Sequence, residues 1–116
     1  MLTINLSERP PSTRILCLDG ELDFFSAFQV CATLDECRAA GATILVVDVG
    51  DVGFVDASAL GVLEKTWPRL RSLGVVVEMV NATERFHWVV SMVGLENTFQ
   101  LAERRRPLLV PETSAQ

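Results

Sequence analysis

The chain has few cysteines, one histidine and no long hydrophobic segment, and each shortage excludes a class of protein. Cys17, Cys31 and Cys37 are odd in number and lack zinc-site or CxxC spacing, which predicts reduced structural thiols in a cytosol. His87 has no other ligand at metal spacing. No apolar run reaches the ~18–20 residues of a membrane span, and the N-terminus lacks a basic and hydrophobic signal segment. We therefore expect a cytoplasmic protein without metal, cofactor or membrane insertion.

Basic residues are also in the minority. The 116 residues include 10 Lys and Arg against 15 Asp and Glu, a formal net charge of −5 at pH 7. This balance argues against broad binding to nucleic acid or to anionic membranes. The length suits one domain that buries about two thirds of its unfolded surface. We assign this domain to residues 1–103 and expect residues 104–116, which begin with three arginines, to form a flexible tail.

Hydrophobic periodicity predicts an α/β fold. Five segments have the pattern of strands, at Leu2–Leu6, Arg14–Leu18, Thr43–Asp48, Val75–Val80 and Phe99–Ala102. The first two are joined by a short loop that contains prolines, so we expect them to pair antiparallel. The strands that alternate with helices are expected to pair parallel through right-handed crossovers.

The first predicted helix follows a turn at Asp19-Gly20, is capped by Ser26 and runs to about Ala40. Its apolar positions are spaced as in a helix, at Phe28, Cys31 and Leu34. Another helix is expected at roughly Glu84–Val93.

Between these two, a further helix begins at Asp56 or Ser58. Pro68 predicts a kink or a break within it. Trp88, in the last helix, is expected to pack in the core, with an anchor in a partner interface as the alternative. The middle helix has one apolar stripe, formed by Leu60, Leu63, Trp67 and Leu70.

The segment Phe54–Leu63 is the most informative part of the chain. It leads from a buried strand into the middle helix, so Asp56 and Ser58 lie where unpaired N–H groups and the helix dipole favour negative charge. A phosphate on Ser58 would be stabilised there and would change the surface shown to a partner. The pattern therefore favours a docking surface over a catalytic pocket.

An enzymatic or metal-binding alternative has less support. Asp48, Asp51 and Asp56 gather near one strand end and could hold magnesium, as in receiver domains. A receiver also needs a lysine after a later strand, and the only lysine, Lys65, falls within a helix. No acid–base pair, nucleophile elbow or phosphate-binding loop is recognisable. We predict that the chain is not an enzyme.

Five motifs occur in one order along the chain: Gly20–Asp23, Val47-Asp48, Val52–Leu63, Gly74–Asn81 and Val93–Phe99. Together they resemble the STAS domain, the module of bacterial anti-sigma factor antagonists, over about residues 13–103. The resemblance implies a mixed, mostly parallel sheet of about five strands flanked by helices. It implies that the domain binds an anti-sigma factor, commonly also a serine kinase, and so frees a sigma factor. Phosphorylation would release the domain, and a metal-dependent phosphatase would reset it.

The chain departs from the family at the residue that matters most. The family's phosphorylated serine directly follows the loop aspartate, in a pattern like Asp-Ser-Ser-Gly-Leu-Gly. Asp56 matches the aspartate, but Ala57 occupies the phosphoserine position, and Ala59 replaces the usual glycine. Because alanine has no hydroxyl, either Ser58 is the acceptor, turned by ~100° around the helix axis, or the domain binds without a switch.

The resemblance also places the partner-binding face. One alternative keeps the fold but makes the chain a non-phosphorylated scaffold or an accessory subunit of a stressosome-like or ABC lipid-transport complex. A homodimer is compatible with either reading. The predicted partner-binding residues are Asp23, Gly53, Phe54, Asp56, Ala57, Ser58, Ala59 and Leu60.

Overall fold

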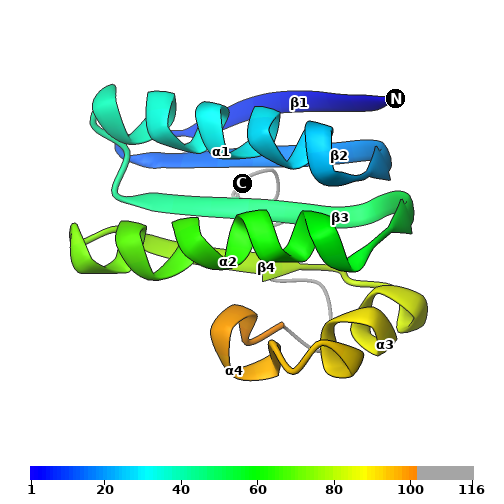
Figure 1. Cartoon of the computed structure of the whole chain (residues 1–116). Coiled ribbons are helices and arrows are strands. Elements are labelled where there is room, and N and C mark those ends of the chain that lie inside the picture. Colours follow the sequence, from blue (N-terminus) through cyan, green and yellow to red (C-terminus); the bar gives the residue numbers. More distant parts are fainter. Residues whose placement is uncertain (102–116) are drawn as a thin grey trace.

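A computed structural model of the chain describes residues 1–101. The expected tail and the three arginines at its start lie outside these residues. The elements in chain order are β1 (Leu2–Arg9), β2 (Thr13–Leu22), α1 (Phe24–Ala39), β3 (Ile44–Val55), α2 (Ala57–Ser72), β4 (Val76–Val80), α3 (Glu84–Met92) and α4 (Glu96–Phe99) (Figure 1).

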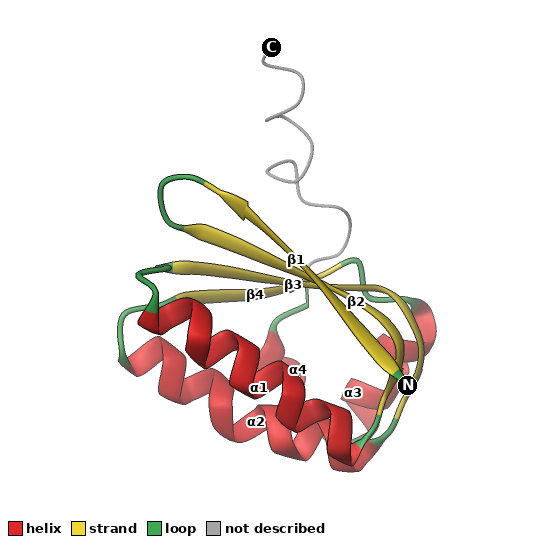
Figure 2. Cartoon of the chain, turned by 90° about the horizontal axis from the view of Figure 1, so that it is seen from above, coloured by secondary structure: helices red, strands yellow, loops and turns green. Residues whose placement is uncertain are grey.

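The strands form one mixed sheet in the order β1-β2-β3-β4. β1 pairs antiparallel with β2, and β2, β3 and β4 pair parallel, which confirms the predicted α/β arrangement. α1 and α2 lie side by side over one face of the sheet, and α3 and α4 continue the helical layer beyond β4 (Figures 1 and 2). No helix within residues 1–101 is long and apolar enough to cross a membrane.

The core lies between the sheet and this helical layer. The stripe predicted for α2 is confirmed, since Leu60, Leu63, Trp67 and Leu70 are all fully buried. α2 runs unbroken through Pro68, so the expected break is absent. Pro68 is exposed, and water can therefore solvate the carbonyl group that the proline leaves without a donor. Buried residues on both sides of Pro68 hold the two halves of the helix against the sheet.

Two predictions near the end of the fold are wrong. Of the segment predicted as a fifth strand, Phe99 is the last residue of α4, Gln100 and Leu101 are in no strand, and Ala102 lies outside the described residues, which contain four strands. The Phe99 ring is buried edge-to-face against Trp67, with ring centroids 5.2 Å apart, and one helical turn suffices to place it. Trp88 is 62% exposed rather than in the core, because α3 packs inward through Phe86 and Val90.

The predicted turn at Asp19-Gly20 is also wrong, because β2 continues to Leu22. The pairing of β2 with β3 is irregular here, with register shifts on both sides of the Asp19-Gly20 pair. Gly20 has φ +120°, and a Cβ atom at this position would lie 2.1 Å from the carbonyl oxygen of Met1. Glycine is required because the backbone of residue 1 passes so close. A sequence pattern typical of a turn thus marks an irregularity within a strand.

Candidate functional site

The two segments that carry the predicted partner-binding residues, one around Asp23 and one around Asp56, lie side by side at the end of the sheet where β2 and β3 terminate. Leu22 and Val55 are paired in the β2–β3 register, and each is followed by an aspartate that starts a helix. The N–H group of Asp56 donates a hydrogen bond to the carbonyl oxygen of Leu22, at 3.3 Å. The structure therefore brings Asp23 and Asp56 together, as the predicted site requires.

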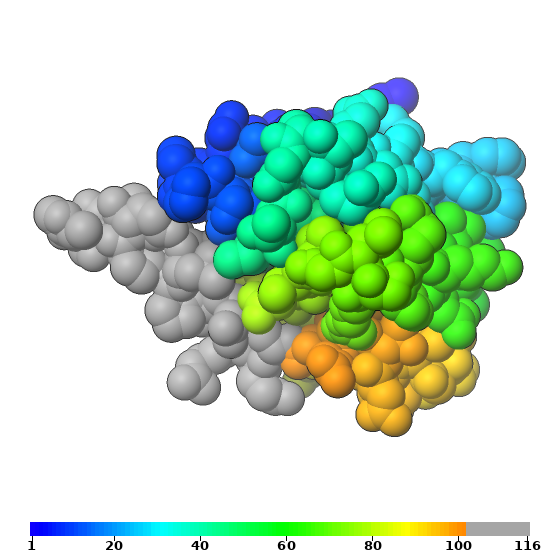
Figure 3. All heavy atoms as spheres, turned by 90° about the vertical axis from the view of Figure 1, so that its left-hand side faces the viewer, coloured from blue at the N-terminus to red at the C-terminus, as the bar shows by residue number. Residues whose placement is uncertain are grey.

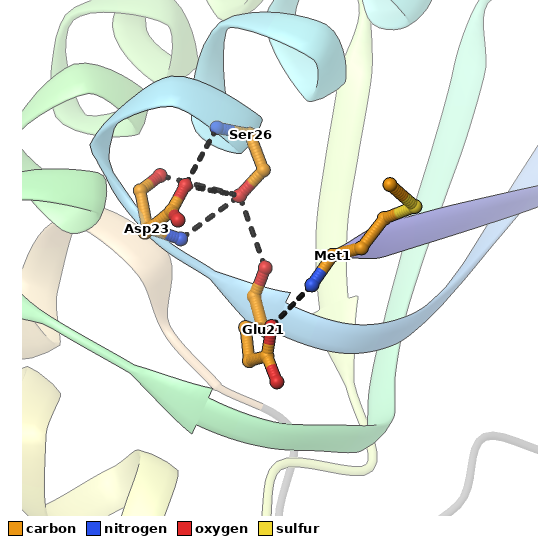
Figure 4. Close-up of polar contacts among 4 residues, drawn as sticks. All are labelled: Met1, Glu21, Asp23 and Ser26. Carbon is orange, nitrogen blue, oxygen red and sulfur yellow. Dashed lines mark hydrogen bonds and ion pairs between the residues drawn. The ribbon is translucent and has the colours of Figure 1, made fainter.

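At the start of α1, Asp23 is the N-cap, and the predicted cap, Ser26, lies three residues further on. The Ser26 N–H group donates to Asp23 Oδ1, and the Asp23 N–H group donates to Ser26 Oγ, both at 2.8 Å (Figure 4). This is a reciprocal capping box. The Ser26 hydroxyl also lies 2.9 Å from Asp23 Oδ1, and the bonds that the backbone N–H group and then the hydroxyl of Ser26 donate to the Asp23 carboxyl group lower its pKa. The Ser26 side chain is buried, so its hydroxyl serves the fold.

Glu21 connects this cap to the first residue of the chain. Its backbone carbonyl oxygen lies 3.0 Å from Ser26 Oγ, within reach of the hydroxyl proton, and its carboxylate forms an ion pair with the amino group of Met1 (Figure 4). The hydrogen bond to Glu21 raises the pKa of this amino group. The segment that leads into α1 is therefore held from two directions.

At the start of α2, Asp56 is the N-cap, as one of the two predicted alternatives had it. Its Oδ1 atom accepts two hydrogen bonds, from the N–H group of Ala59 at 2.9 Å and from the hydroxyl of Ser58 at 2.7 Å. The Ser58 side chain is exposed and lies in the first turn of the helix. The predicted hydroxyl is thus accessible and held by a carboxylate.

Some of the other predicted site residues are exposed, and some are buried in the core. Gly53, Phe54 and Ala57 are exposed. Ala59 and Leu60 are fully buried, because the inner face of α2 turns them toward the sheet. We therefore leave Ala59 and Leu60 out of the candidate surface; they hold the first turn of α2 in place.

Exposed phenylalanines surround this turn, and sequence reasoning missed most of them. Four of the six phenylalanines are exposed: Phe24 at 44%, Phe25 at 78%, Phe28 at 52% and Phe54 at 43%. Phe24 packs edge-to-face on both Phe25 and Phe28, at 5.4 and 5.1 Å between ring centroids.

Helical spacing predicts that Phe28, Cys31 and Leu34 lie on one apolar stripe of α1. Only Leu34 of the three is fully buried, and the inner face of α1 is formed instead by Ala27, Val30, Leu34 and Cys37. Phe24 and Phe28 are four residues apart, so they lie on the same side of the helix and off this inner face. This spacing could have indicated an exposed apolar pair from the sequence.

The three aspartates weighed as a metal site do not form one. Asp48 Oδ1 accepts from the N–H group of Gly50 and Asp48 Oδ2 from the side-chain amide of Asn81, each at 2.9 Å, which ties β3 to the end of β4. Asp51 lies within β3, opposite Asp19, and Asp56 caps α2. Among residues 1–101, no group of three His, Cys, Asp or Glu side chains could hold a metal ion.

Comparison with known proteins assigns the family. The family model of the STAS domain matches residues 5–106. The chain belongs to the STAS domain family, and the predicted resemblance and fold are confirmed. Comparison with curated proteins found no match.

Solved structures share the fold at low sequence identity. The anti-sigma factor antagonist SpoIIAA of Bacillus, in its unphosphorylated form, is 17% identical with a TM-score of 0.73, covering 98% of each chain. An anti-sigma factor antagonist from Mycobacterium paratuberculosis is 20% identical with a TM-score of 0.78, covering 96% of this chain and 93% of its own. A sulfate transporter family protein from Wolinella succinogenes is 15% identical with a TM-score of 0.70, covering 84% and 82%.

Proposed function

We propose that this chain is an anti-sigma factor antagonist that acts in the cytoplasm by binding and without catalysis. It binds an anti-sigma factor through the surface formed by Asp23, Gly53, Phe54, Asp56, Ala57 and Ser58, and so frees a sigma factor. The observation that carries the proposal is the exposed hydroxyl of Ser58 in the first turn of α2, surrounded by exposed phenylalanines. A buried hydroxyl, or one surrounded only by polar side chains, would not form such a protein-binding surface.

Phosphorylation of Ser58 is the proposed switch, with the anti-sigma factor as the serine kinase and a metal-dependent phosphatase as the enzyme that resets it. A phosphate adds about −1.5 to −2 charges at pH 7. Ser58 Oγ lies 2.7 Å from Asp56 Oδ1, so the phosphate would lie against a carboxylate and would replace the hydroxyl proton that now bonds to it. Repulsion and bulk weaken the partner contact, while the N-terminus of α2 stabilises the added charge and keeps the domain folded.

Binding is tested by calorimetric titration of the purified chain with each anti-sigma factor encoded by its source organism. We expect one of them to bind wild type, and Ser58→Glu to bind it about tenfold or more weakly, a loss of ~1.4 kcal/mol. Ser58→Ala is the matched control and is expected to bind within about threefold of wild type, since it removes the hydroxyl without adding charge.

The outcomes separate binding from switching. If no anti-sigma factor binds wild type, the chain is not an antagonist. If one binds wild type and Ser58→Glu equally, the chain is an antagonist without this switch. Mass spectrometry after incubation with the same proteins and ATP checks directly whether Ser58 gains a phosphate.

Ala57 favours a second candidate function, a scaffold or accessory subunit that stays bound without phosphorylation. Alanine stands at the position where the family's phosphoserine is expected, and its side chain is exposed. This function predicts a stoichiometric complex with sibling STAS proteins or with an ATPase of a transport complex, stable to ATP. Size-exclusion chromatography of the complex with and without ATP distinguishes it from the switched antagonist.

A further inference from the structure

A groove of about 700 Å³ lies between α1 and α2. Phe24, Phe28 and Cys31 line it from α1, and Ser58, Val62 and Thr66 line it from α2; we call it the α1–α2 groove. The segment around the start of α1, light blue in the space-filling view, protrudes at one edge of the molecule (Figure 3). The groove is open to solvent on the side of the helices that faces away from the sheet.

The middle of the groove is apolar and uncharged. Phe24 and Phe28 present half-exposed rings, and Val62 faces them from α2. Cys31 is half-buried, and its sulfur lies 3.1 Å from the hydroxyl oxygen of Thr66. Burial, the largest cause, raises the pKa of the Cys31 thiol, so the thiol is neutral at pH 7. Such a lining binds aliphatic or aromatic groups in preference to charged ones.

The charged side chains that line the groove balance one another, since Asp35 and Glu64 are acidic and Lys65 and Arg69 are basic. Arg69 forms a two-pronged ion pair across the two helices, with its Nη2 atom 2.9 and 3.0 Å from the oxygens of Asp35. The pair bridges α1 and α2 next to the groove. Its two charges compensate each other, so they give little attraction to a charged ligand.

The end of the groove near Ser58 has a different border, which is acidic. Asp23 and Asp56 cap the two helices there, and Glu21 lies just before Asp23 at the end of β2. No lysine or arginine occurs in residues 15–37 or 39–64. A ligand for this groove therefore combines an apolar stripe with positive charge toward one end.

We propose that the α1–α2 groove binds an amphipathic helix of the partner protein. Its aliphatic side chains pack between Phe24, Phe28 and Val62, and its lysine or arginine residues lie near Asp23 and Asp56. Two helices packed side by side form a groove into which the ridge of a third helix fits. The inference deepens the proposed function and rests on it only for the identity of the partner. A phosphate on Ser58 would stand at the mouth of the groove, where its bulk, and not its charge, would hinder a helix that carries lysine or arginine.

The binding test uses a probe that does not require the natural partner. The probe is a synthetic lysine–leucine peptide of about 18 residues, long enough to form a helix, with leucines at i, i+3, i+4 and i+7 spacing. The comparison peptide has the same composition with its leucines spread around the helix. Binding to the full chain is measured by fluorescence anisotropy at about 0.15 M salt, where attraction by charge alone is screened.

We expect wild type to bind the striped peptide about tenfold or more tightly than the spread peptide, and Phe28→Ala to lose this preference. Trp88→Ala is the matched control, since it removes an exposed aromatic side chain from α3, away from the groove, and should keep the preference. Phe28 is 52% exposed, so its truncation should leave the thermal midpoint close to that of wild type. Amide chemical shifts are expected to change along Phe24–Asp35 and Ser58–Arg69.

Three results would overturn the proposal. Equal affinity for the two peptides would show that the groove does not recognise an apolar stripe on a helix. Loss of the preference in Trp88→Ala but not in Phe28→Ala would place the site on α3. A wild-type dimer that Phe28→Ala dissociates, or a co-purified lipid in native mass spectrometry that this variant loses, would give the groove another occupant. Each of these results leaves the anti-sigma factor titration standing, so the two proposals fail separately.

Discussion

Two helices begin at the same end of the molecule with an aspartate cap, and a serine follows each cap at a different distance. In α1 the serine is three residues after Asp23, and it completes a reciprocal capping box with its side chain buried. In α2 the serine is two residues after Asp56, and its side chain is exposed. The third position after Asp56 is Ala59, which is fully buried. One position of sequence thus separates a hydroxyl used for folding from a hydroxyl available to another protein.

The largest expected effect is on the buried serine. Ser26→Ala should lower the free energy of unfolding by about 1–2 kcal/mol, because the N–H group of Asp23 loses its acceptor in a partly buried place. Urea denaturation measures this, with Ser58→Ala as the matched control. We expect Ser58→Ala to change stability by less than about 0.5 kcal/mol. If Ser26→Ala and Ser58→Ala lowered the free energy of unfolding equally, the two serines would not differ in their contribution to the fold.

The second helix cap gives the next effect. Asp56→Ala should cost about 1 kcal/mol, because the N–H group of Ala59 then has no side-chain acceptor in the first turn. Asp56→Asn is the control and should recover most of the loss, since asparagine is an equally good N-cap. Both variants are measured by urea denaturation. If the asparagine variant lost as much as the alanine variant, the charge of Asp56 rather than its cap would stabilise the fold.

Acid should affect the first cap in a defined direction. The pKa of Asp23 is lowered in the folded chain by the bonds from Ser26. Its stabilising contribution is therefore complete above the unfolded pKa of about 3.9 and is lost as pH falls through the lower, folded value. Asp23→Asn keeps a capping oxygen but cannot titrate. We expect its unfolding free energy to fall less than that of wild type below about pH 4. If the free energies of unfolding of wild type and Asp23→Asn fell equally with pH, the carboxyl group of Asp23 would not contribute to this acid sensitivity.

The smallest effect on stability is expected at the position between the cap and Ser58. Ala57→Ser adds one hydroxyl to an exposed residue in the first turn and should change the unfolding free energy by less than about 0.5 kcal/mol. It should create a second phosphate acceptor for a kinase that recognises the usual family position. Mass spectrometry locates the phosphate. Phosphorylation of Ser58 but not of the new residue would show that the kinase fits the shifted hydroxyl.

The parts of the fold with unambiguous periodicity were predictable. The buried stripe of α2 has a polar opposite face, so only one orientation buries its apolar residues. The antiparallel pairing of β1 and β2 and the parallel pairing of the rest followed from loop lengths. A helix start at Asp56 or Ser58 was predictable, because either side chain can accept a backbone N–H bond, and the structure shows that Asp56 is the cap.

The errors fall where more than one arrangement fits the local pattern. α1 has apolar residues on more than one side, and its inner stripe could not be chosen without the sheet beneath it. Asp19-Gly20 is a common turn pair, and only the close approach of Met1 makes Gly20 part of a strand. A strand or a helical turn could each have brought the ring of Phe99 into the core. The chain forms a turn, which places this ring against Trp67.

The sequence by itself determined the α/β fold, a helix start at Asp56 or Ser58 and the absence of a hydroxyl at residue 57, because each depends on local chemistry or on a regular period. The tertiary structure alone decided that the side chain of Ser26 is buried in a capping box and that the side chain of Ser58 is exposed. It also decided that Phe24 and Phe28 flank a groove with Val62. These outcomes depend on which helix faces meet the sheet and each other, and that is settled by packing between segments far apart in the chain.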